Sequence, residues 1–424
     1  METAGLRDFD AGHQLLLACA LTPAAPDVFA TVSRLAERVQ RWHEFLASVE
    51  ANQLHPQAAA HLSGPSAPDS VSEDVRACLA AAARAHAGRA LFMSAELVSV
   101  LRALRTANIE AVALKGPAFA ALSGDGVTSR ELTDLDVLIR PADITRAASS
   151  LSSLGYECPL PPQAVASAWL PRATNELPLV ARQGAVLLEL HWSLAPSWFP
   201  APVAAEDILA TAGEREFAGV RISWPHADQL FLIHAADGMK SGGSGVRWLA
   251  DLLAILRAGG IDWRRTRAIA ERNQGLNSVR VALAVADALS SGLAASLERP
   301  DLGLDLPSSA RVLGAEARAN KRLARAVDAI RDRLRMDARL VGATAHFRWA
   351  LQVADRPARI AASIARYASR PTIADLAAMP PEGLADAPLR LRAFRRRLKG
   401  NRVSNRSSVV RDAALPHPDG HRRA

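Results

Sequence analysis

Two aspartates spaced two residues apart, Asp134 and Asp136, are the first residues of this sequence whose spacing suggests chemistry. They lie in the apolar stretch TDLDVLI, and alternate residues of a β-strand face the same side. Both carboxylates would therefore share one face of a strand, opposite Leu135 and Val137. Two neighbouring carboxylates beside a buried strand are costly unless a cation neutralises them. The pattern indicates a site for a metal ion and phosphate.

A third carboxylate and two cations in the sequence are suited to the same site. Glu189 lies in a second apolar stretch, VLLELHW. Three carboxylates on neighbouring strands suit Mg²⁺ (or Mn²⁺), since such hard cations bind carboxylate and phosphate oxygens. Lys115 and Arg130 would supply the positive charge that a nucleotide's phosphates need. Gly116 would let the backbone approach a phosphate closely.

His191 lies two residues after Glu189 and therefore on the same strand face. It could orient a substrate phosphate or act as a general base. It could equally hydrogen-bond Glu189 or fill the space beside it, and the sequence leaves these alternatives open. Trp192 faces the other side and is expected in the core.

Other candidate groups point to structure rather than to catalysis. His234 and Asp251 lie in apolar stretches, and we expect Asp251 to form a buried pair with a histidine or an arginine. Four further histidines have no partner at ligand spacing and are expected to be ordinary surface or core residues: His43, His55, His61 and His86. Neither a P-loop motif nor a G-x-G-x-x-G motif between strand and helix occurs.

The elements that must position these residues form a short sheet. Strand-like runs are predicted at Ile109–Leu114, Leu132–Ile139 and Ala185–Trp192, with a short helix at Ala118–Leu122 and another after Pro141. A polar loop that ends at Arg130 joins the first two strands. Strand, loop, strand, helix and strand in this order predict a small sheet domain over residues 106–225.

Amphipathic helical patterns flank this sheet on both sides. Before it, in residues 1–105, helices are predicted at Val28–Ala47 and Ala87–Leu104. After it, in residues 226–385, they are predicted at Ala227–Gly238, Arg247–Leu256, Asp262–Gln274, Val279–Leu289, Ala315–Leu334 and Thr344–Tyr367. The predicted fold class is α+β.

Composition adds limits. The chain has 424 residues with 49% hydrophobic and 22% charged residues, typical of a globular protein. No apolar run approaches the ~20 residues of a membrane span, and three distant cysteines indicate no disulfide framework, so we expect a cytoplasmic protein.

Among 51 basic residues only Lys115, Lys240, Lys321 and Lys399 are lysines. A lysine at a strand end is thus unusual in this chain.

The net charge of +8 comes from the C-terminal end. Residues 390–424 contain ten arginines and one lysine against two aspartates, so the rest of the chain is nearly neutral. We expect residues 386–424 to be a basic, partly disordered tail. A weak contact with nucleic acid or anionic lipid is the alternative for this tail.

At the residues singled out above, the sequence resembles the uncharacterised nucleotidyltransferases of the DNA polymerase beta-like superfamily. That family has a Leu-Lys-Gly turn, an arginine shortly before an Asp-x-Asp strand, and a later Glu-Leu-His-Trp strand. The matching residues are Leu114-Lys115-Gly116, Arg130, Asp134-Leu135-Asp136 and Glu189-Leu190-His191-Trp192. The resemblance continues into both helical flanks, over about residues 10 to 400.

The resemblance implies a nucleotidyltransferase core with Asp134, Asp136 and Glu189 binding Mg²⁺ and an NTP. The expected reaction transfers NMP from an NTP donor to an acceptor that the sequence does not identify: a small molecule, a protein or a nucleic acid. Two alternatives stay open. The chain could be an inactive nucleotide-binding or scaffold protein of the same fold, or it could transfer a phosphoryl group as a kinase does.

Overall fold

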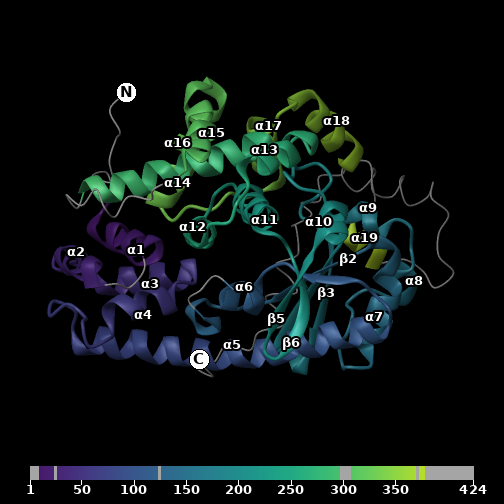
Figure 1. Ribbon diagram of the computed structural model, residues 1–424, viewed down its shortest axis with the longest axis horizontal. Helices are drawn as coiled ribbons and strands as arrows, with labels where there is room; N and C mark the ends of the chain where they lie inside the picture. Colours follow the sequence, from purple (N-terminus) through teal and green to yellow (C-terminus); the bar gives the residue numbers. More distant parts are fainter. Residues whose placement is uncertain (1–8, 23–25, 123–125, 297–306, 369–371, 378–424) are drawn as a thin grey trace, which may run out of the picture.

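The computed structural model describes residues 9–22, 26–122, 126–296, 307–368 and 372–377. Its N-terminal region consists of the helices α1 (Ala11–Leu21), α2 (Pro26–Ala36), α3 (Trp42–Asn52), α4 (His55–Leu62) and α5 (Glu73–Thr106). Helix α5 begins where Ser72 accepts a hydrogen bond from the Val75 amide, with Glu73 and Asp74 in the first turn. Its 34 residues make it about 51 Å long. It extends from beneath α4 to the sheet (Figure 1).

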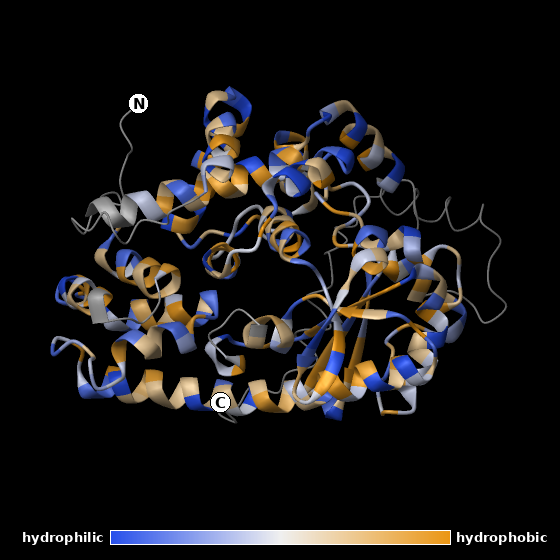
Figure 2. Ribbon diagram, viewed as in Figure 1, coloured by the Kyte–Doolittle hydropathy of each residue, from blue (hydrophilic) through white to orange (hydrophobic). Residues whose placement is uncertain are grey.

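A mixed four-stranded sheet follows, made of β1 (Ala111–Ala113), β2 (Leu135–Ile139), β3 (Glu176–Ala181) and β4 (Val186–His191). The strand order is β1-β2-β4-β3. β2 and β4 are parallel, whereas the β1–β2 and β3–β4 pairs are antiparallel. β2 and β4 are buried at every position, and the strands are mostly hydrophobic in Figure 2. Their carboxylates therefore lie within the protein rather than on its surface.

Short elements connect these strands and extend the core. They are α6 (Gly116–Leu122), η2 (Val127–Ser129), η3 (Pro141–Asp143), α7 (Ile144–Ser152), α8 (Pro162–Val165), α9 (Leu170–Ala173), η4 (Arg182–Gly184) and α10 (Ala205–Thr211). A separate hairpin pairs β5 (Gly213–Phe217) with β6 (Val220–Trp224). Its turn is Ala218-Gly219, both with positive φ, as the type I′ turn of two-residue hairpins requires.

The C-terminal helices follow the hairpin. They are α11 (Ala227–Lys240), α12 (Arg247–Ala258), α13 (Trp263–Arg272), α14 (Leu276–Ser296), α15 (Ser308–Ala319), α16 (Lys321–Arg335), α17 (Ala343–Val353), α18 (Pro357–Ala368) and α19 (Ile373–Ala377). Helices α13 to α18 form the layer at the top of Figure 1, whereas α19 lies beside α9. None of the helices in the described ranges is both long and apolar enough to pass through a lipid bilayer.

The α+β class is confirmed, and the three predicted strands are present in shortened form. Three predicted helices are wrong as single helices, because Val28–Ala47, Ala315–Leu334 and Thr344–Tyr367 each divide in two. Asn320 ends α15 and its side chain caps α16, accepting hydrogen bonds from two amides. Pro357 begins α18, where a proline fits only the first turn. The basic tail lies outside the described residues.

Candidate functional site

The parallel pairing of β2 and β4 brings the predicted acids together. Asp136 lies directly opposite Glu189, and Leu138 lies opposite His191. Because the register is set by two buried strands, the two carboxylates meet on the same face at the same level. Asp134 lies just before β2, half-buried, and accepts a hydrogen bond from the Thr133 hydroxyl at 3.1 Å. Asp134 lies outside the group of side-chain atoms within 4.8 Å of one another that Asp136 and Glu189 form with His191.

His191 lies among three carboxylates, and we call Asp136, Glu189, Glu176 and His191 the acidic cluster. Its Nε2 is 2.9 Å from Oδ1 of Asp136 and 3.5 Å from Oε2 of Glu189. Its Nδ1 is 3.4 Å from Oε2 of Glu176, which β3 contributes. Glu176 is half-buried and the other three side chains are buried.

The protonation states of the acidic cluster follow from its burial and its charges. Burial alone lowers the pKa of His191, but the hydrogen bonds to Asp136 and Glu189 raise it to about 10 overall. Burial raises the pKa of Asp136, yet the charges of Lys115 and His191 outweigh it and hold that pKa below its usual value. The pKa of Glu189 is raised, chiefly by burial and further by the neighbouring carboxylates. His191 is thus an imidazolium that donates to Asp136.

Two lysines lie next to the acidic cluster: Lys115, which follows β1, and Lys240, at the end of α11. We call them the lysine pair. Lys115 is fixed beside β2, because the Leu114 amide donates to the Asp136 carbonyl at 3.0 Å. Its Nζ is 2.8 Å from Oδ1 of Asp237 on α11, and Nζ of Lys240 is 3.4 Å from the same oxygen. One carboxylate therefore holds both ammonium groups.

Gly116 makes the turn that directs Lys115 toward the site. Its φ is +69°, in the left-handed region that favours glycine. A Cβ at this position would lie 3.5 Å from the Asp134 carbonyl, an ordinary contact. The backbone conformation, rather than a lack of space, therefore explains the glycine.

A small hollow of about 10 Å³ separates the lysine pair from the acidic cluster, lined by Leu114, Lys115, Asp136, His191, Leu194, Ile233, Asp237 and Lys240. That volume is roughly the space of one water molecule. The lysine pair and the acidic cluster therefore lie close together with almost no space between them. A nucleotide would enter only if side chains at the hollow moved apart.

Arg130 does not line this hollow. Its guanidinium donates to both carboxylate oxygens of Asp251, through Nε at 3.0 and 3.1 Å and through one terminal nitrogen at 2.9 Å. Nδ1 of His234 is 3.7 Å from the same carboxylate. Asp251 thus forms the expected buried pair, which joins α12 to the loop before β2. The positive charge of Arg130 therefore faces Asp251 and not the small hollow.

Three residues of the site were not predicted from the sequence: Glu176, Asp237 and Lys240. Lys240 had one usable signal, since it is one of only four lysines in the chain. Glu176 begins an edge strand that contains a proline, and Asp237 lies inside a helix that reads as ordinary. Both join the site only through tertiary packing.

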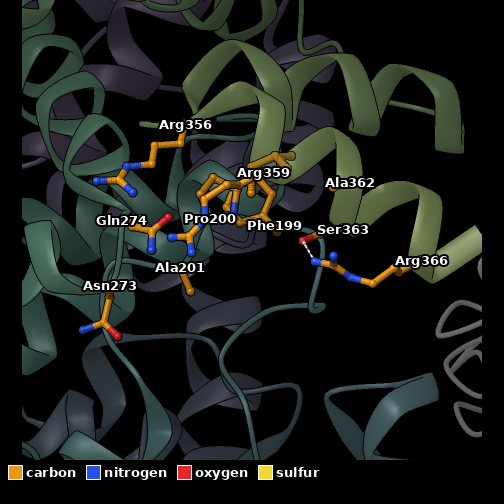
Figure 3. Close-up of a pocket in the computed structure, with 11 residues that line it drawn as sticks. Phe199, Pro200, Ala201, Asn273, Gln274, Arg356, Arg359, Ala362, Ser363 and Arg366 are labelled. Atoms are coloured by element: carbon orange, nitrogen blue, oxygen red, sulfur yellow. Dashed lines mark hydrogen bonds between the residues drawn. The ribbon is translucent and has the colours of Figure 1, made fainter.

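A larger pocket of about 420 Å³ lies elsewhere on the molecule, between α18 and the segments around Pro200 and Asn273. Arg356, Arg359 and Arg366 line it, and Arg366 donates to the Ser363 hydroxyl at 2.9 Å (Figure 3). No member of the acidic cluster or the lysine pair lines this pocket. It is therefore separate from the predicted site.

The donor set of the acidic cluster fits a hard divalent cation. Asp136 and Glu189 offer carboxylate oxygens from neighbouring strands, while His191, as an imidazolium, stays a hydrogen-bond donor beside them. Nδ1 of His191 is buried and forms no hydrogen bond to the described residues. Carboxylate oxygens near ammonium groups are suited to Mg²⁺ with phosphate.

Comparison with known proteins gives one match. The family model described as uncharacterised nucleotidyltransferase matches residues 39–291, more than half of the 424 residues. The matched range contains the acidic cluster and the lysine pair. Neither the curated proteins nor the solved structures gave a match. The chain therefore belongs to the uncharacterised nucleotidyltransferase family.

Proposed function

We propose that this protein transfers NMP from an NTP to an acceptor at the acidic cluster. The observation that supports this most is the register of β2 and β4, which places Asp136 against Glu189 within reach of the lysine pair. Asp136 and Glu189, with Asp134 beside them, would hold Mg²⁺ (or Mn²⁺). When bound, this ion would neutralise charge on the phosphate oxygens.

The lysine pair would bind the phosphates of the NTP. Lys115 and Lys240 both face Asp237 in the closed arrangement, so phosphate oxygens would replace that carboxylate as their partner. Compact ammonium groups suit this exchange, because lysine acts as a mobile point charge. Arg130 would not contact the phosphates. Through Asp251 it would hold in place the segment that ends at Asp134.

The transfer requires one bond to form and one to break. An acceptor oxygen attacks the α-phosphorus, the bond from that phosphorus to the bridging oxygen breaks, and pyrophosphate leaves. The acceptor proton passes to a carboxylate. His191 is already protonated, so it would position Asp136 rather than take a proton.

The test uses NTPs labelled at the α-phosphate, Mg²⁺ and a cell extract as the source of acceptor. We expect label transfer with pyrophosphate release. The variants Asp136→Asn and Glu189→Gln should lose activity by on the order of 100-fold or more while they keep the native circular dichroism spectrum. Glu214→Gln, which removes an exposed carboxylate on the β5–β6 hairpin, should match the wild type.

The alternatives give different products. Transfer from a γ-labelled NTP with release of NDP would identify a kinase-like reaction. NTP binding without transfer in any extract would identify a nucleotide-binding or scaffold protein. Wild-type NTP affinity in the Asp136→Asn/Glu189→Gln double variant would show that the nucleotide binds elsewhere.

A further inference from the structure

His55, His86 and Glu131 come from distant segments of the sequence and meet at one point, which we call the His–Glu cluster. His55 is the first residue of α4, His86 lies in the middle of α5, and Glu131 precedes β2. Nδ1 of His55 is 2.7 Å from Oε1 of Glu131, and Nε2 of His86 is 3.3 Å from its Oε2. The three ligand atoms lie within 4.8 Å of one another.

Surrounding contacts hold Glu131 in place. The backbone amide of His55 donates to its Oε1 at 2.9 Å, and Arg247 donates to its backbone carbonyl at 2.8 Å. The side chain of Glu131 is 6% exposed, whereas those of His55 and His86 are 17% and 27% exposed. The cluster therefore has a buried carboxylate and an outer side that water can reach.

These three residues match a known ligand set for zinc. Two histidines and one glutamate bind zinc in mononuclear sites that keep a fourth position for water. Metal–ligand bonds of about 2.0–2.2 Å place the ligands of a tetrahedral site about 3.3–3.6 Å apart. The His86–Glu131 distance of 3.3 Å already fits. The shorter His55–Glu131 contact of 2.7 Å would lengthen with a metal ion between the two atoms.

An ion pair alone explains this geometry less well. One protonated imidazole is enough to neutralise one carboxylate. Glu131 already contacts both the ring and the backbone amide of His55, so it does not need His86 as a second partner. The His86 ring nevertheless stacks on the His55 ring, with centroids 5.1 Å apart and an interplanar angle of 24°. Two imidazolium ions in this arrangement would repel each other, whereas two neutral imidazoles on one carboxylate are what a metal ion binds.

The nearby arginines limit which metal fits. Arg89 donates to the carbonyl oxygens of Leu132, Thr133 and Ala185, and Arg247 donates to that of Glu131. Both guanidinium charges oppose a cation held mainly by charge, such as Mg²⁺ or Ca²⁺. A borderline-soft ion that binds imidazole nitrogen tolerates them better.

We infer that the His–Glu cluster binds a transition-metal dication of the Zn²⁺ class, with water in the fourth position. This departs from the expectation that His55 and His86 are ordinary histidines. Sequence spacing did not reveal the cluster, because its ligands come from two helices and a loop. The bound ion would join α4 and α5 to the segment that leads from Arg130 to Asp134.

The test measures metal binding by the full-length protein with Asp136→Asn and Glu189→Gln, so that the acidic cluster does not compete. After treatment with a chelator, the protein is titrated with Co²⁺ and then with Zn²⁺. We expect one equivalent of Co²⁺ to bind with the visible absorption of a low-coordinate nitrogen–oxygen site, and Zn²⁺ to displace it. Adding His86→Gln should weaken Co²⁺ affinity by roughly 100-fold.

His86→Gln is the informative variant, because Glu131 keeps its contacts with His55 and the fold should survive. His43→Gln is the matched control, since His43 is 80% exposed and should leave Co²⁺ binding unchanged. The inference is overturned if the folded parent protein gives no cobalt absorption, or if His86→Gln binds Co²⁺ as the parent does. No nucleotide is present, so neither result depends on the proposed transfer reaction.

Discussion

Asp237 holds two lysines whose charge a nucleotide would need. Burial raises the pKa of this carboxyl, but Lys115 and Lys240 lower it well below its usual value. If a triphosphate binds here as we propose, it would compete with this carboxylate for both ammonium groups. In the proposed reaction, Asp237 would thus be the group that phosphate displaces.

Arg130 and Asp251 provide a prediction at the scale of the residue. Both side chains are buried, and removal of one partner from a buried pair costs about 3–5 kcal/mol. Arg130→Met should therefore lower the free energy of unfolding by that amount, measured with urea. The double variant Arg130→Met/Asp251→Leu should recover part of the loss. If Arg130→Met instead unfolds like the wild type but binds NTP more weakly, Arg130 contacts phosphate directly.

Helix α11 is the element that brings the C-terminal helices to the sheet. Asp237 and Lys240 lie in its last turn, and the Met239 carbonyl accepts a hydrogen bond from the Trp349 indole at 2.6 Å. Between these residues, Gly238 faces the ring of Trp248 on α12. A Cβ added at Gly238 would lie only 2.2 Å from that ring, which is too close for any side chain. The close approach of α11 and α12 therefore depends on this glycine.

Gly238→Ala should destabilise the protein by about 1–3 kcal/mol, because the new methyl group would push the Trp248 ring and α12 away. Gly88→Ala is the matched control in α5, where an added Cβ meets nothing within 4 Å. It should stabilise the protein by about 0.5–1 kcal/mol. Urea unfolding of both variants checks the pair. Equal effects of the two substitutions would argue against close packing at Gly238.

The sequence predicts the elements of this protein unevenly, for physical reasons. β2 and β4 are recognisable because their apolar runs are buried on both faces. β5 has the sequence GEREF and is largely exposed, so it forms through pairing with β6 rather than by its own propensity. β3 contains Pro178, which is tolerated because β3 is an edge strand. Asp136 and Glu189 were thus predictable, whereas Glu176 was not.

At the scale of the whole molecule, the first helix is tied to the C-terminal region. Nδ1 of His13 on α1 is 2.8 Å from Oδ2 of Asp10, and its Nε2 is 3.1 Å from Oδ2 of Asp337, which follows α16. Asp337 also accepts hydrogen bonds from Ser48 and Asn52 at 2.7 and 3.2 Å. One carboxylate after α16 therefore binds side chains from two N-terminal helices, α1 and α3.

This contact predicts a pH dependence of stability. The hydrogen bond to Asp337 raises the pKa of His13 to about 9, against the opposing effect of burial, from an ordinary 6.5. The folded state therefore gains stability that is complete below pH 6.5 and is lost as the pH rises through about 9. At pH 6, His13→Gln should cost on the order of 1 kcal/mol after solvent screening.

At pH 10 the difference between His13→Gln and the wild type should be largely gone. Urea unfolding at both pH values measures it, with His43→Gln, whose side chain is 80% exposed, as the control. A constant difference between the two pH values would mean that His13 contributes by packing rather than by its charge.

Helix α5 contacts the segment before β2 and the turn that leads into β4. Within α5, His86 faces Glu131, Arg89 donates to the carbonyls of Leu132, Thr133 and Ala185, and Glu96 pairs with Arg182 at 3.2 Å. Inserting one residue between positions 86 and 96 would turn one set of contacts by about 100° relative to the other. Evolution should therefore have kept the length of this stretch constant in related chains, even where its surface residues differ.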